Sequence, residues 1–249
     1  MKKLERVQTP YNDVEVWRNR DGSIDFDVVG ATHATWHPSR LMTGHAWDAI
    51  TGAVLLHPEP PGSLLMLGLG GGTVLRQLRR FLPGVQLTAV EIDGDMIRLA
   101  RTYMDLDALE VEIIEADAFA YLGETRRRFD IVVDDLYRCG EKDVERPEEV
   151  TRELIGTLRD RLAPGGSLVM NFVTGAGHHR QHRRARKAFL ESFASVRAIR
   201  PPLSHNEALV GTTAPGGLRG PRALGKVKDV LDNETDRGFW KELRNLKLR

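Results

Sequence analysis

A glycine-rich turn directly after a short apolar run is the feature that most constrains this chain. The run Leu64–Leu67 has the composition of a strand that is buried on both faces, and helical periodicity follows over residues 74–82. Glycines allow a sharp turn and let a ligand approach the bare backbone, while the turn presents amide donors at a helix N-terminus. The pattern predicts a nucleoside site, and the residues expected to form it are Gly68, Gly70, Gly71 and Gly72.

Apolar runs and helical stretches alternate through the middle of the chain. Strand-like runs at 87–92, 111–114, 131–133 and 168–172 are separated by helical patterns at 95–104, 118–122 and 148–162. This order predicts an α/β fold with a doubly wound, mostly parallel, seven-stranded Rossmann-like sheet. Within residues 11–36, apolar and polar residues alternate on both sides of Asp21-Gly22, which predicts a β-hairpin with its turn at that pair. Ser39 is expected to cap a helix over 39–56. We expect an N-terminal hairpin region at 1–38, the nucleoside-binding α/β domain at 39–213 and a helical, basic tail at 214–249.

Two acids follow predicted strands. Glu91 closes the second strand, about 20 residues after the glycine turn, where a carboxylate accepts hydrogen bonds from ribose hydroxyls. Asp117 follows the third strand and is placed to face an adenine amino group, although a helix N-cap is nearly as good an interpretation. The alternative interpretation of Glu91 is a solvated acid at the end of its strand. A dinucleotide fold would place its third glycine later than Gly72.

Composition excludes several classes of protein. A single cysteine rules out a disulfide framework and a cysteine-rich zinc site. His33 and His37 flank Trp36 and are expected at the site entrance, with no metal. No apolar run approaches the roughly 18 residues of a membrane helix, and no apolar stretch follows the N-terminal lysines. We therefore expect a cytoplasmic protein without a membrane partner.

The C-terminal part is basic. From residue 176 onward the chain holds 16 Lys and Arg against 7 Asp and Glu, with the densest run at 178–187. No aromatic residues interleave with that run, and on a helix its charges would lie opposite Ala188, Leu190 and Phe193. We interpret it as a solvated helix face and do not expect a nucleic-acid partner. The amphipathic tail is expected to pack on the core or on a second subunit.

Several runs together carry a family resemblance. The segments LLHPEPPGSLLMLGLGGGTVLRQL, TAVEIDGDMIRLARTYM, EADAFAYL, RRFDIVVDD and LRDRLAPGGSLVMNF resemble the spermidine synthase family, which lies within the class I S-adenosylmethionine (AdoMet) methyltransferase superfamily. The resemblance extends over roughly residues 11–212 and is most specific in 57–172.

The resemblance implies a role for each matching residue. Glu91 would bind the ribose, and the adjoining Ile92 would belong to the same cofactor site. Asp117 and Ala118 would bind the adenine, and Asp135 would position or deprotonate the attacking amine. Strand alternation should turn the neighbouring Asp134 away from Asp135, unless both are solvated loop acids. The substrate side would take in Tyr11, His45, Trp47, Asp134 and Tyr137, although His45, Trp47 and Tyr137 have packing roles as alternatives. Members of the family are commonly oligomeric, so a homodimer is expected.

The departures from the family pattern decide the expected reaction. Gly71 stands where polyamine-making members carry an aspartate for the donor's aminopropyl ammonium, and His45-Ala46-Trp47 replaces a Tyr-His-Glu run. Asn12 stands for a glutamine and Leu136-Tyr137-Arg138 for a Ser-Asp-Pro stretch. We therefore expect an AdoMet-dependent transferase acting on a small amine or amino-acid-like substrate, with methyl transfer favoured. Aminopropyl transfer from decarboxylated AdoMet is the alternative. A nucleoside- or partner-binding module without catalysis and a nucleic-acid methyltransferase are further alternatives.

Overall fold

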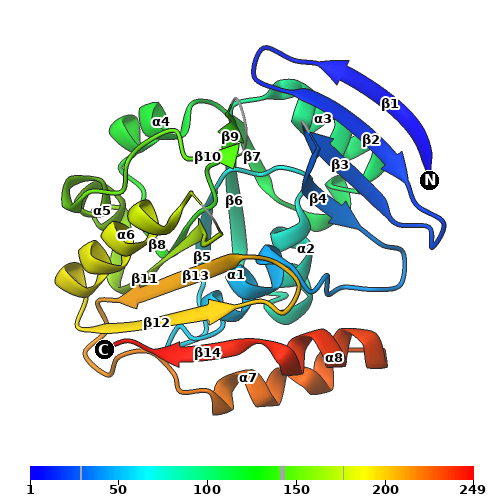
Figure 1. Ribbon diagram of the computed structural model, residues 1–249. Helices are drawn as coiled ribbons and strands as arrows, with labels where there is room; N and C mark the ends of the chain where they lie inside the picture. The colour runs from blue at the N-terminus through cyan, green and yellow to red at the C-terminus, as the bar shows by residue number, and fades with distance from the viewer. Residues whose placement is uncertain (29, 141–143, 176) are drawn as a thin grey trace.

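The computed structural model describes residues 1–28, 30–140, 144–175 and 177–249 and is built around a central sheet, which has eight strands in that part of the chain (Figure 1). These strands are β5 (Ser63–Leu67), β6 (Gln86–Glu91), β7 (Glu112–Glu115), β8 (Phe129–Asp134), β11 (Leu162–Val173), β12 (Ser195–Arg200), β13 (Asn206–Thr212) and β14 (Arg244–Lys247). Their order is β14-β12-β13-β11-β8-β5-β6-β7. The five strands from β11 to β7 run parallel, and β13, β12 and β14 are paired antiparallel.

Helices cover both faces of this sheet. One face packs against α1 (Ala46–Val54), α2 (Thr73–Phe81) and α3 (Gly94–Tyr103), and the other against α4 (Ala118–Glu124), α5 (Arg152–Arg159) and α6 (His179–Ser192). The side chains of β5 alternate between the two faces of the sheet. Leu64 and Met66 pack in the core with α1 to α3, while Leu65 and Leu67 pack in the core with α4 to α6. The doubly wound α/β fold predicted from the sequence is therefore confirmed.

A separate antiparallel sheet precedes the α/β unit. It comprises β1 (Lys2–Gln8), β2 (Asp13–Arg18), β3 (Ile24–Val28) and β4 (Ala31–Trp36), paired in chain order. The expected hairpin is thus part of a four-stranded sheet within the described residues. Val14, Val16 and Phe26 are fully buried in the same core as α1 to α3, so this sheet packs directly on the α/β unit. A short ribbon of β9 (Arg138–Cys139) and β10 (Val144–Glu145) follows β8.

Helix α1 begins later than the sequence predicts. The helix expected over 39–56 starts at Ala46, with His45 rather than Ser39 at the N-cap position. The backbone N–H groups of residues 41–44 donate instead to two buried carboxylates, Asp236 and Asp48. These tertiary hydrogen bonds satisfy the backbone in a non-helical conformation.

The C-terminal segment contributes a strand as well as helices. After α7 (Arg222–Val227), a 3-10 turn η2 (Lys228–Val230) and α8 (Glu234–Glu242), the chain enters β14, whose Leu246 pairs with Ala198 of β12. The tail expected to be helical over 214–249 therefore ends its last helix at Glu242 and continues as a strand. With β14, the sheet has eight strands in the described residues rather than the seven expected. The boundaries expected at 38/39 and 213/214 stay a prediction. Among the described residues, no helix combines the length and apolarity needed to cross a membrane.

Candidate active site

The glycine turn lies at the edge of the sheet where the parallel strands end, which we call the carboxyl edge. Gly68 has φ +86° and donates its N–H to the carbonyl of Val90 at 2.9 Å. A Cβ atom on Gly68 would lie 2.7 Å from the carbonyl oxygen of Asp135. Only glycine allows both this dihedral angle and this approach. The turns after β5 and β8 are therefore in direct contact.

Glu91 is bound to the glycine turn. Its Oε2 accepts the N–H of Leu69 at 2.9 Å and of Gly70 at 3.2 Å, while its Oε1 accepts the N–H of Asp93 at 3.1 Å. Burial raises the pKa of Glu91 despite these three donors. The sequence prediction that Glu91 and the glycine turn share one site agrees with this geometry, and the same carboxylate oxygens are suited to accept hydroxyl donors.

Asp117 acts as a helix cap. Its Oδ1 accepts the N–H groups of Phe119 at 2.9 Å and Ala120 at 2.8 Å, which caps α4. Its Oδ2 has no hydrogen-bond partner among the described residues, so the cap leaves one oxygen available. Ala118 is buried, while Ile92 is 37% exposed at the same edge of the sheet. The two interpretations of Asp117 are compatible, because the residue is exposed and only Oδ1 caps the helix.

The two acids at the end of β8 lie in different environments. Asp134 is fully buried, and both of its oxygens accept from Nη2 of Arg146, at 2.7 and 2.6 Å. Asp135 is partly exposed, and its Oδ1 accepts from Nδ2 of Asn171 at 2.8 Å. Burial raises the pKa of Asp135 to about 7. Strand alternation therefore separates a structural carboxylate from one that is able to exchange a proton near neutral pH.

Tyr137 has a structural hydroxyl. It donates to the carbonyl of Asn171 at 3.0 Å and accepts the N–H of Val173 at 3.1 Å, which ties the turn after β8 to β11. Burial raises the pKa of Tyr137 to about 12. The guanidinium of Arg146 lies 5.6 Å from the Tyr137 ring centroid. Sequence reasoning missed Arg146 and Asn171, because no local pattern identifies the partners of a strand-end acid.

The N-terminal sheet is attached next to the site. Oγ1 of Thr9 donates to Oδ2 of Asp93 at 2.6 Å, and Nδ2 of Asn12 donates to the same oxygen at 3.2 Å. These bonds hold the β1–β2 turn, with Tyr11 49% exposed, against the turn after β6. Tyr11 is thereby placed beside the carboxyl edge.

His45 is at the N-cap position of α1, and Trp47 lies in the first turn of that helix. Their rings contact each other at the start of α1, with centroids 6.2 Å apart, and Trp47 packs against the core formed by α1 to α3. Within the described residues, neither side chain makes a hydrogen bond to Asp135 or to the glycine turn. The structure therefore supports the packing alternative for Trp47.

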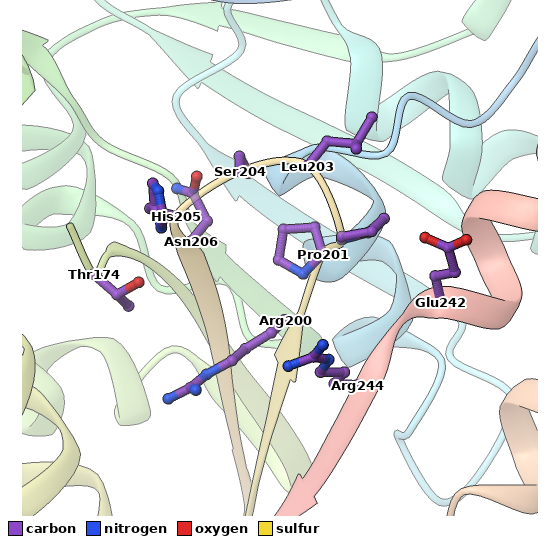
Figure 2. A pocket seen from close by; sticks show the side chains of 10 residues that line it. Thr174, Arg200, Pro201, Leu203, Ser204, His205, Asn206, Glu242 and Arg244 are labelled. Carbon is purple, nitrogen blue, oxygen red and sulfur yellow. The ribbon is translucent and has the colours of Figure 1, made fainter.

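A pocket of about 640 Å³ lies at the hairpin between β12 and β13 (Figure 2). Nδ2 of Asn206 in its wall donates to Oδ1 of Asn171 at 3.2 Å, and Asn171 in turn holds Asp135. The pocket is therefore two hydrogen bonds away from Asp135. Sequence reasoning missed it, because its wall combines distant segments: Thr174, residues 200–206, Glu242 and Arg244. No group of three or more His, Cys, Asp or Glu suited to a metal ion occurs in the described residues.

This fold, with a glycine turn after one strand and an acid at the end of the next, is common to nucleoside-binding proteins of the doubly wound type, which include the class I AdoMet-dependent enzymes. The spermine/spermidine synthase domain matches residues 47–198. The chain therefore belongs to the spermine/spermidine synthase family, and the resemblance inferred from the sequence is confirmed.

Individual relatives agree with this assignment. The chain is 29% identical over 163 residues to the probable polyamine aminopropyl transferase of Bifidobacterium longum, covering 65% of this chain and 35% of that protein. It therefore spans about a third of that relative's length. It is 28% identical over 224 residues to the polyamine aminopropyltransferase of Neisseria meningitidis serogroup A, covering 89% of this chain and 82% of that protein. A probable spermidine synthase from Corynebacterium glutamicum has the same fold, with a TM-score of 0.71 at 19% identity over 97% of this chain and 95% of that one.

These comparisons correct one expectation. Methyl transfer from AdoMet was favoured on the sequence, because Gly71 lacks a carboxylate for the donor's ammonium. The family match and the aminopropyltransferase relatives contradict that preference and favour the alternative, aminopropyl transfer.

Proposed function

We propose that this protein is an aminopropyltransferase that moves the aminopropyl group of decarboxylated AdoMet to a small amine of the polyamine type. The observation that carries the proposal is the Asp135 carboxylate, partly exposed next to the glycine turn, held by Asn171 and with its pKa raised to about 7. A base with this pKa is suited to take a proton near neutral pH.

The reaction follows from the donor's chemistry. The amine lone pair attacks the methylene carbon on the sulfonium, a C–N bond forms, and the C–S bond breaks to release neutral 5′-methylthioadenosine. The new ammonium then loses a proton, and Asp135 is the proposed acceptor. The sulfonium is already an activated leaving group, so the protein's contribution is to align the amine and keep it unprotonated.

Donor binding is assigned to the other residues of the carboxyl edge. Glu91 is proposed to accept hydrogen bonds from the ribose hydroxyls in place of those from the N–H groups of Leu69 and Gly70. Oδ2 of Asp117 would accept a hydrogen bond from the adenine amino group. Ala118 and Ile92 would flank the adenine ring as apolar neighbours. The substrate-side roles expected for Tyr11, His45, Trp47 and Tyr137 stay predictions, as do the homodimer and the cytoplasmic location.

The ion pair of Asp134 with Arg146 supports this division of roles. Its two side chains are 0% and 1% exposed, so the Asp134 carboxylate is neutralised away from solvent. Asp135 is then the one carboxylate at the end of β8 that is available to an amine.

Incubation with decarboxylated AdoMet and a panel of linear diamines, followed by mass spectrometry, tests the proposal. Wild-type protein should release 5′-methylthioadenosine and form an amine larger by one aminopropyl group. Asp135→Asn should lower the rate about 10²–10⁴-fold and leave donor affinity within a few-fold. Donor binding without thioether release on any amine would contradict the proposal and favour a binding module without catalysis.

A further inference from the structure

The glycine turn has no room for a side chain at position 71. A Cβ atom on Gly71 would overlap Sδ of Met104 and lie 2.5 Å from Cβ of Ala34. Met104 and Ala34 are both buried, so the space is filled by packed apolar atoms. The primary ammonium of an aminopropyl donor therefore needs an acceptor from elsewhere, because an unpaired ammonium is costly in a closed site.

Strand β4 crosses the glycine turn on that side. The backbone N–H of Thr35 donates to Oγ1 of Thr73 at 3.1 Å, and this hydroxyl donates back to the carbonyl of Thr35 at 2.9 Å. The carbonyl oxygen of His33 would lie 3.2 Å from a Cβ atom on Gly70. The backbone around residues 33–35 is therefore fixed directly against the turn.

His33 is the extra residue of a β-bulge. Phe26 pairs with Ala34 and Asp27 pairs with Thr32, so His33 has no partner residue on β3. Bulges occur beside active sites, where they redirect a side chain. The side chain of Ala34 packs against Gly71. In a bulge, two residues of one strand face a single residue of the other, so the side chain of His33 departs from the strict alternation of β4.

The imidazole of His33 has a ring nitrogen, Nε2, that makes no hydrogen bond within the described residues. This nitrogen is buried, although the residue as a whole is partly exposed. Burial lowers the pKa of His33, which favours the neutral ring. In the tautomer that carries its proton on Nδ1, Nε2 is a hydrogen-bond acceptor. A buried polar atom without a partner is costly unless a ligand or water satisfies it.

We propose that Nε2 of His33 accepts a hydrogen bond from the terminal ammonium of the donor's aminopropyl chain, in place of a side chain at position 71. This inference rests on the proposed function, since it concerns the same donor. His33 is then a specificity-determining residue for the amine-bearing chain and contributes little to binding of the nucleoside itself.

Two ligands separate these contributions in calorimetric titrations. The first is decarboxylated AdoMet, and the second is 5′-deoxy-5′-dimethylsulfonioadenosine, which keeps the nucleoside and the sulfonium and lacks the amine-bearing chain. His33→Ala should weaken binding of the first ligand about tenfold or more, because hydrogen bonds to charged groups are worth about 1.5–3 kcal/mol. Binding of the second ligand should change less than about twofold. His33→Gln, which keeps an acceptor oxygen, should recover most of the loss.

His179→Ala is the control. His179 is exposed in the first turn of α6, which packs on the opposite face of the sheet from Ala34. Both ligands should bind to His179→Ala as they do to wild type.

The outcomes distinguish the two proposals. Equal weakening of both ligands in His33→Ala, or no weakening of either, would overturn the role of His33 while leaving the proposed function intact. Wild-type protein that binds neither ligand would overturn the proposed function and this inference with it.

Discussion

Removing the cation of the buried ion pair should strongly destabilise the protein. In Arg146→Met the carboxylate of Asp134, which is fully buried, loses the Nη2 group that lies 2.7 and 2.6 Å from its oxygens. Breaking a buried pair on one side costs about 3–5 kcal/mol, because an uncompensated charge remains in the interior. The free energy of unfolding of Arg146→Met should fall by that amount.

Urea denaturation followed by circular dichroism measures the loss, with the slope of the transition compared between variants. The double variant Asp134→Val/Arg146→Met removes both charges, so it should be far more stable than the sum of the two single changes implies. Arg127→Met is the control. Arg127 pairs with Glu112 at 2.8 Å, but its side chain is 46% exposed. That change should cost less than about 1 kcal/mol. A loss below about 1 kcal/mol in Arg146→Met, or additive losses in the double variant, would refute the reasoning.

Three further predictions concern the site itself. Gly71→Ala should cost about 1–3 kcal/mol by overpacking against Met104, and Met104→Ala in the same chain should recover part of the loss in thermal melts. Glu91→Gln should weaken donor binding about tenfold in calorimetry, because ribose hydroxyls then donate to a neutral amide instead of a carboxylate. Asp135→Asn should melt above wild type at pH 8 and converge with it toward pH 4. The pKa of Asp135 is raised from 3.8 to about 7. Between these pH values the unfolded chain releases this proton while the folded protein keeps it, so the free energy of unfolding falls as the pH rises. Equal melting differences at both pH values would contradict this assignment.

Sequence reasoning succeeded where local pattern and strand direction determine the outcome. The glycine turn, Glu91 and Asp135 lie at the ends of β5, β6 and β8, which are neighbouring parallel strands, and the carboxyl ends of parallel strands meet at one edge of a sheet. The opposite environments of Asp134 and Asp135 also follow from the two-residue period of a strand. These features need no information from distant parts of the chain.

The features that the sequence did not reveal depend on long-range contacts. The start of α1 depends on Asp236, which lies nearly 200 positions away along the chain. Its carboxylate accepts the backbone N–H groups of Leu41 and Met42 and so holds these residues outside the helix. Strand β14 was expected to be helical, because its pairing with β12 leaves no local signature. The sequence also did not reveal Arg146 as the partner of Asp134. Nor did it reveal that Nε2 of His33 has no hydrogen-bond partner among the described residues, because this depends on the bulge opposite Phe26.

Calorimetric titration of wild-type protein with decarboxylated AdoMet and with AdoMet, side by side, tests the central claim most directly. We expect decarboxylated AdoMet to bind more tightly than AdoMet, because the donor of an aminopropyltransferase carries an amine without a carboxylate. Tighter binding of AdoMet, or binding of neither compound, would contradict it.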